Sequence, residues 1–169
     1  MRSNLLKFFI IFSLIFFGFS APAQENREEA KAMLQKFKNG MLLIRLQTSH
    51  MAIDALMEQG RAKKAEEVKS KQYLENKETI LAFKQAYNFC PVYFFYAPDS
   101  KKIEKGQLEG VIFNSELQII NNTTPLPAFY LIGEFDETPN LGMDGLILKN
   151  QKFIPLQAPF PFTNANTSF

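Results

Sequence analysis

The run from Cys90 to Ala97 (CPVYFFYA) constrains the fold more than any other segment, because it is apolar or aromatic at nearly every position. Successive side chains of a strand point to opposite faces of the sheet, so a strand of this composition is covered on both sides. Pro91 lies at the start of the run, where a missing backbone donor is tolerated. The sequence therefore predicts a buried strand, whose second face is covered by the first helix, by the C-terminal segment or by a partner.

Three amphipathic helices are predicted ahead of this strand, over residues 25–38, 49–59 and 61–87. The third contains no Pro or Gly, and its apolar stripe predicts an inward face made of Tyr73, Asn76, Ile80, Phe83 and Tyr87. Residues 40–47 have two interpretations, a helix that continues through Gly40 or a first strand. We favour the strand, because Gly interrupts a helical pattern and the apolar residues alternate.

Four further strands are predicted after the buried one, over residues 110–114, 128–135, 145–149 and 152–156, the last two as a hairpin. If the first strand pairs in parallel with 90–97, the helices between them form the crossover. The later connections look too short for helices, which predicts antiparallel neighbours. We expect an α/β (α+β) fold: one domain with a mixed sheet of about five or six strands and helices packed mainly on one face.

Residues 1–23 have the pattern of a secretory signal peptide. Arg2 and Lys7 precede an uncharged run over residues 8–19, and Ala21-Pro22-Ala23 fits a cleavage site. A run of about 12 apolar residues is shorter than the roughly 20 that span a membrane. The sequence predicts cleavage between Ala23 and Gln24, export to the periplasm or the medium, and no integral membrane segment afterwards.

The predicted mature chain, residues 24–169, is expected to be one globular domain. It is mostly helical over 24–88 and mostly strands over 89–157, and it ends in a C-terminal tail over 158–169. Without Arg2 and Lys7 it carries 17 basic and 17 acidic side chains, so its net charge gives no reason to expect a nucleic-acid partner.

One Cys and one His cannot form a disulfide or a Cys/His zinc site, and no cofactor motif occurs, so no metal or cofactor is predicted. The only acidic cluster on the predicted strands and their ends, Glu134, Asp136 and Glu137, lacks a calcium-loop pattern. We expect these carboxylates, at the end of a strand and in the loop that follows it, to be solvated.

Cys90 with His50 and Asp54 is the best catalytic candidate in the sequence. A thiolate nucleophile needs a base, and the base needs an orienting carboxylate, which Asp54 could supply from one helical turn beyond His50. The competing interpretation is that Cys90 is a small buried hydrophobic residue, whose raised pKa would make it inert.

Arg45, Asn76, Tyr93 and Tyr96 are the candidate binding residues. Arg45 would be a lone charge on a largely apolar strand, either exposed or an anion ligand in a cleft. Asn76 interrupts the apolar stripe of its helix, and a buried amide needs a hydrogen-bond partner, which a neighbouring backbone could also supply. Tyr93 and Tyr96 belong to the aromatic strand.

These observations favour an exported, non-enzymatic module that binds an unknown protein or small molecule in the cell envelope, and they leave an enzymatic role open. One alternative is a thiol-dependent enzyme or redox protein using Cys90 with His50. Another is a structural subunit of an envelope complex. The usual hydrolase and phosphate-binding motifs do not occur in the sequence.

Overall fold

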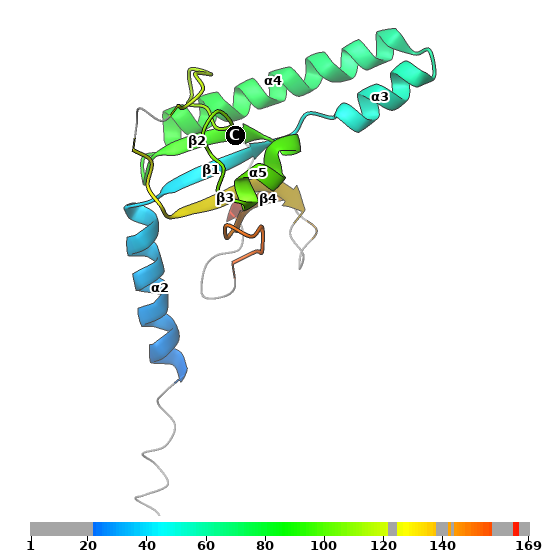
Figure 1. Ribbon diagram of the computed structural model, residues 1–169. Helices are drawn as coiled ribbons and strands as arrows, with labels where there is room; N and C mark the ends of the chain where they lie inside the picture. Colours follow the sequence, from blue (N-terminus) through cyan, green and yellow to red (C-terminus); the bar gives the residue numbers. More distant parts are fainter. Residues whose placement is uncertain (1–21, 122–124, 138–141, 143, 157–163, 166–169) are drawn as a thin grey trace, which may run out of the picture. The chain divides into compact units, whose positions relative to one another are not determined.

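The computed structural model describes residues 22–121, 125–137, 142, 144–156 and 164–165 (Figure 1). The chain divides into two compact units, residues 1–35 and 36–169. Helix α2, Pro22–Lys38, begins in the first unit and ends in the second, which confirms the predicted helix over 25–38. The proposed cleavage site lies in the first turn of α2, and the rest of the predicted signal lies outside the described residues.

Four strands form the mixed sheet of the second unit: β1 Met41–Leu46, β2 Val92–Tyr96, β3 Tyr130–Glu137 and β4 Asp144–Lys149. Their order is β2-β1-β3-β4, and a two-residue segment, β5 Asn164–Ala165, pairs with β4. β1 pairs in parallel with β2 and with β3, whereas β4 is antiparallel to β3. The strand interpretation of 40–47 and its parallel pairing with the buried aromatic strand are therefore confirmed.

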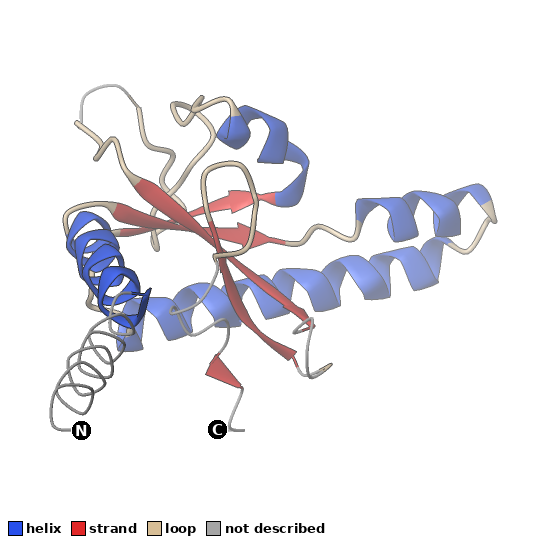
Figure 2. Cartoon of the chain, turned by 90° about the horizontal axis from the view of Figure 1, so that it is seen from below, coloured by secondary structure: helices blue, strands red, loops and turns tan. Residues whose placement is uncertain are grey.

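Helices α3, His50–Glu58, and α4, Ala62–Ala86, connect β1 to β2, as predicted. Ile80 and Phe83 of α4 are buried in one core with Leu42 and Ile44 of β1 and with Phe94 of β2. Figure 2 shows α4 along one side of the sheet. Apolar residues recur about every 3.6 positions in the helix and every second position in the strands, so each element has one apolar face, and these faces pack together.

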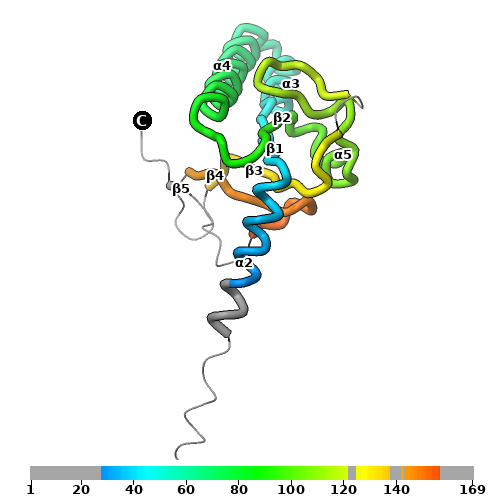
Figure 3. Tube along the Cα trace, turned by 90° about the vertical axis from the view of Figure 1, so that its left-hand side faces the viewer, coloured from blue at the N-terminus to red at the C-terminus, as the bar shows by residue number. Residues whose placement is uncertain are grey.

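A second core lies on the opposite face of the sheet, where the short helix α5, Ser100–Glu104, packs. Met41 and Leu43 of β1 and Phe95 of β2 are buried there with Ile103 of α5 and with Ile112. Figure 3 shows β1 and β2 between α4 and α5. The chain itself, through α5 and the segment after it, covers the second face of the aromatic strand.

Two fold predictions were wrong: the number of strands and the direction of β3. Residues 110–114 and 152–156 are not strands, because Phe113 and Pro155 make only isolated bridges. Both segments are apolar because their side chains reach a core: Ile112 and Phe113 are buried, and so is Leu156. Without a strand at 110–114, the connection from β2 to β3 is long enough to return over the α5 face and enter β3 in parallel.

The amino-terminal part of α4 and the whole of α3 extend beyond the ends of the strands (Figure 1). We call α3 with residues 61–71 the arm. The inward stripe predicted for this helix holds for Ile80 and Phe83, but Tyr73 is 59% exposed. The reason is that the sheet ends beneath this turn: Tyr96, the last residue of β2, lies beside Tyr73 in one groove. Among the described residues, no helix is both long and apolar enough to cross a membrane.

Candidate functional site

A groove lies between α4 and the loop that follows β2 and α5. We call it the α4 groove. Its volume is about 170 Å³. It is lined by Tyr73, Asn76, Lys77, Ile80 and Leu81 of α4, Tyr96 of β2, and Ser115, Glu116 and Leu117 of the loop. Several of its apolar side chains are exposed, among them Leu81, Tyr96 and Leu117. Exposed apolar side chains that gather around a depression are typical of a binding surface, whereas scattered ones are not.

The loop wall of the groove is held by its own hydrogen bonds. The side-chain oxygen of Asn114 accepts bonds from the backbone N–H of Glu116 (3.0 Å) and of Gln118 (2.9 Å). Phe113 bridges to Ile119, which closes the loop at its base. Leu117 has a φ of 62°, a left-handed conformation that is uncommon for a non-glycine residue. Local backbone strain that keeps an apolar side chain in solvent is characteristic of functional loops.

An ion pair ties this loop to α4. The Nζ of Lys84 lies 3.0 Å from the Oε1 of Glu116. This Lys84 hydrogen bond is the main cause that lowers the pKa of Glu116 below its usual value. Beneath the loop, the ring of Phe113 packs against Tyr96, with centroids 5.1 Å apart, and stacks on Phe94 at 6.1 Å. The groove is therefore bordered by Tyr96, whose ring packs on Phe113, and by a wall tethered to α4.

Two of the four predicted binding residues meet in this groove, Asn76 and Tyr96. The Nδ2 of Asn76 donates a hydrogen bond to the carbonyl oxygen of Gln47, 2.8 Å away. A neighbouring backbone group therefore supplies the hydrogen-bond partner of Asn76, which is one of the two interpretations that the sequence allowed. Tyr96 is 39% exposed at the end of its strand. Tyr93 lies elsewhere, half-buried against the second core on the opposite face of the sheet.

Arg45, the fourth candidate, belongs to a partly buried charge cluster on the α5 face. Its guanidinium pairs with the carboxylate of Glu134, and its Nε donates to the Oγ of Ser100 at 3.0 Å. The Nζ of Lys149 binds the other oxygen of Glu134 at 2.5 Å. Glu134 is 6% exposed, so the prediction that it is solvated was wrong. It lies within the predicted strand, and β3 carries it on the α5 face of the sheet, where Arg45 and Lys149 pair with it.

The structure does not bring Cys90 and His50 together. Pro91 accepts the backbone bond of Leu42, so Cys90 lies beside the start of β1. His50 and Asp54 lie on α3, after the end of β1. The paired part of β1, from Leu42 to Leu46, alone spans about 13 Å, far beyond the roughly 3 Å of a hydrogen bond between nucleophile and base.

The partner of Cys90 is the hydroxyl of Tyr87, whose oxygen lies 3.1 Å from the Sγ. Burial raises the pKa of the Cys90 thiol, and the hydrogen bond from Tyr87 only partly opposes this effect. Burial also raises the pKa of Tyr87. His50 has a local partner of its own, since its Nδ1 lies 3.1 Å from the Oγ1 of Thr48. Cys90 thus has the surroundings of an unreactive thiol.

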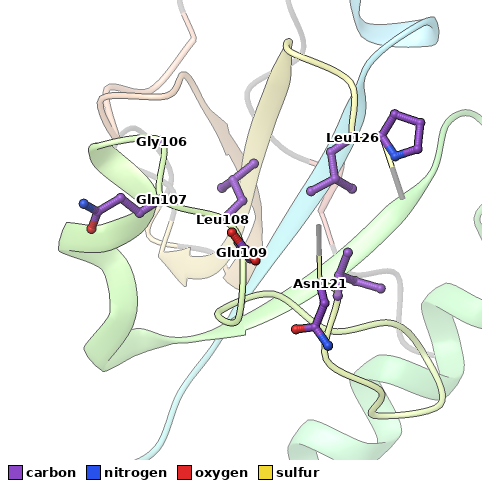
Figure 4. Close-up of a pocket in the computed structure, with 8 residues that line it drawn as sticks. Gly106, Gln107, Leu108, Glu109, Asn121 and Leu126 are labelled. Carbon is purple, nitrogen blue, oxygen red and sulfur yellow. The ribbon is translucent and has the colours of Figure 1, made fainter. Parts of the chain in front are cut away.

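A second depression, of about 560 Å³, lies at the end of α5. Figure 4 shows Gly106, Gln107, Leu108 and Glu109 on one side of it, with Asn121 and Leu126 on the other. Polar and apolar groups both line it, and residues 122–124, next to Asn121, lie outside the described part.

Sequence reasoning missed the loop residues Leu117 and Glu116 and the buried pairing of Lys149. The Asn114-to-Gln118 turn offered one signal, because Asn accepts backbone bonds in tight loops. In the part of the chain that the structure describes, no group of three or more His, Cys, Asp or Glu side chains could hold a metal ion. Comparison with protein-family models, with curated proteins and with solved structures gives no match for this chain.

Proposed function

We propose that the chain is an exported, non-enzymatic binding module of the cell envelope, and that the α4 groove binds one apolar side chain of a protein partner. The observation that carries the proposal is the set of apolar side chains held exposed around the groove by a tethered loop. Export is supported by the signal pattern of residues 1–23.

The size of the groove limits what it can take. A cavity of about 150 Å³ holds one benzene molecule. A groove of about 170 Å³ therefore matches one aromatic ring or one branched aliphatic side chain. Tyr73 and Tyr96 also carry hydroxyl groups, and amphipathic rings of this kind are enriched where proteins bind other proteins. A protein segment that inserts a single large side chain fits these features best.

Binding of blocked amino acids tests the proposal directly. Protein labelled with nitrogen-15 is titrated with N-acetyl-phenylalanine amide and N-acetyl-leucine amide, with N-acetyl-serine amide as the polar probe. We expect amide shifts that concentrate around Tyr96, Leu81 and residues 114–118 for the two apolar probes only. Shifts that are spread evenly over the surface, or are equal for the serine probe, would contradict the proposal.

Two pairs of variants on the same elements provide matched controls. Leu117→Ser and Leu81→Ser remove groove side chains and should abolish the probe shifts. Ile119→Ser and Leu74→Ser remove exposed side chains of the same loop and helix that do not line the groove, and should leave the shifts unchanged. Equal effects in both pairs would mean that the groove is not the site.

The thiol-dependent alternative has its own test, the rate at which Cys90 reacts with an aromatic disulfide between about pH 5 and 9. Because burial raises its pKa, we expect the folded protein to react far more slowly than the denatured chain. A fast reaction with an apparent pKa below the usual range would favour the enzyme.

A further inference from the structure

Lys77 lines the α4 groove without an ionic partner. Its neighbours on the helix surface are the residues three and four positions away, and these are Tyr73, Leu74, Ile80 and Leu81. Its own helix therefore offers it no acidic side chain at that spacing. Within the described part of the chain, Lys77 forms no ion pair with any other residue. The ammonium group of Lys77 is thus free to bind a ligand of the groove.

Glu116, the other charged side chain that lines the groove, already has its partners. Its Oε1 lies 3.0 Å from the Nζ of Lys84 and accepts a hydrogen bond from the Oγ of Ser115, also at 3.0 Å. Glu116 and Lys84 balance each other's charge. The charge that remains at the groove is the positive charge of Lys77.

The groove also contains two tyrosine hydroxyls that can donate hydrogen bonds. Tyr73 lies four residues before Lys77 on the same face of α4, and Tyr96 lies in the same groove at the end of β2. The hydroxyls of Tyr87 and Tyr130 have partners, whereas those of Tyr73 and Tyr96 bond to no other described residue. Ammonium and hydroxyl groups together suit a carboxylate, which only accepts hydrogen bonds when ionised.

We propose that the partner segment carries an acidic side chain next to the apolar side chain that it inserts into the α4 groove. This inference rests on the proposed function and adds the charge of the partner to it. The apolar side chain fills the groove, and the neighbouring carboxylate binds Lys77 and the hydroxyls of Tyr73 and Tyr96. A basic segment would meet the uncompensated charge of Lys77, so this residue also acts against the wrong partner.

Three peptides that differ only in charge test the proposal. They are acetyl-Asp-Phe-Asp amide, acetyl-Asn-Phe-Asn amide and acetyl-Lys-Phe-Lys amide, and titration of nitrogen-15-labelled protein gives a Kd for each. We expect the acidic peptide to bind on the order of fivefold more tightly than the Asn peptide at low salt, and the basic peptide to bind most weakly. The advantage of the acidic peptide should shrink as salt is added.

Variants of α4 show whether Lys77 causes the preference. Lys77→Gln should make the acidic and Asn peptides bind equally, and Lys77→Glu should make the basic peptide the tightest. Lys71→Gln is the matched control, because Lys71 is an exposed lysine of the same helix that pairs with Glu75 and does not line the groove. It should keep the preference for the acidic peptide. If Lys71→Gln reduces the preference as much as Lys77→Gln does, the effect is one of general charge and the inference is wrong.

Failure of this inference can be told apart from failure of the proposed function. If none of the three peptides shifts the amides of residues 114–118, the groove is not the site, and both proposals are wrong. If all three shift these amides with the same Kd, the groove binds an apolar side chain and the acidic partner is wrong. Tighter binding of N-acetyl-phenylalanine, which has a terminal carboxylate, than of the acidic peptide would also overturn the acidic side chain.

Discussion

The two ends of α4 differ in what they contact, although the helix is continuous. Its carboxyl-terminal part packs on the sheet, where Ile80 and Phe83 are buried and the ring of Phe83 meets Phe94 at 6.2 Å. Its amino-terminal part has α3 as its neighbour, and the one residue buried there is Ala65. The difference shows that one end of this helix packs in the core and the other end forms exposed surface. The α4 groove lies where the two parts meet.

Phe83→Ala should have the largest effect, because it removes a ring from the core end of the helix. Truncation of a buried Phe costs about 3–5 kcal/mol of unfolding free energy. Tyr73→Ala, on the same helix but exposed, should change stability by less than about 0.5 kcal/mol. Urea unfolding measures both, and equal losses would mean that the two ends are not different after all.

Ala65→Glu tests the arm end of the comparison. Ala65 is 2% exposed, so a longer charged side chain there should force α3 away from α4. Overpacking of this kind costs about 1–3 kcal/mol, and we expect the loss to be local. Hydrogen exchange should show faster exchange in α3 and unchanged protection in β1. Ala62→Glu, exposed in the first turn, is the matched control and should preserve the arm.

Asn76→Ala should have a smaller effect at the boundary between the two ends. It removes the hydrogen bond to the Gln47 carbonyl, which anchors the helix to the end of β1. Loss of one such bond costs about 0.5–1.5 kcal/mol. Lys77→Ala, the exposed neighbour, should be close to neutral in urea unfolding. If both variants are neutral, the anchor contributes nothing to stability.

Acid should loosen the groove loop with the smallest effect of all. The pKa of Glu116 is lowered in the folded protein, so the tether to Lys84 is complete above the ordinary pKa of a glutamate. It is lost as the pH falls through the lowered folded value. Nitrogen-15 spectra should show the amide chemical shifts of residues 114–118 following a single titration in this acid range. Lys84→Ala removes the tether, so the part of the pH dependence that comes from the tether should be lost. Amides of the arm should not follow it.

Local pattern was enough to place α3, α4, β1 and β2, because each has a clear period and Gly or Pro near its ends. It failed for residues 110–114, where an apolar run is buried without being a strand. An apolar run reports burial, and only the pairing of backbone groups separates a strand from a packed loop. That single error also produced the wrong direction for β3.

The candidate site was only partly predictable for a related reason. Asn76 stood out as a polar residue in an apolar stripe, and Tyr96 as part of the aromatic strand. Leu117 and Lys84 did not, because an exposed Leu or Lys looks the same in sequence whether or not it borders a groove. Glu134 was wrongly expected to be solvated, since its two cationic partners come from positions 45 and 149, far away in the sequence.

By itself, the sequence determined which segments carry apolar faces. It also limited thiol and imidazole chemistry to one Cys and one His. These properties depend on residue order over short distances. The tertiary structure alone decided that β3 is parallel to β1, that Cys90 and His50 are apart, and that two predicted binding residues share one groove. Such facts depend on contacts between residues far apart in the chain, and these form only when whole faces pack together.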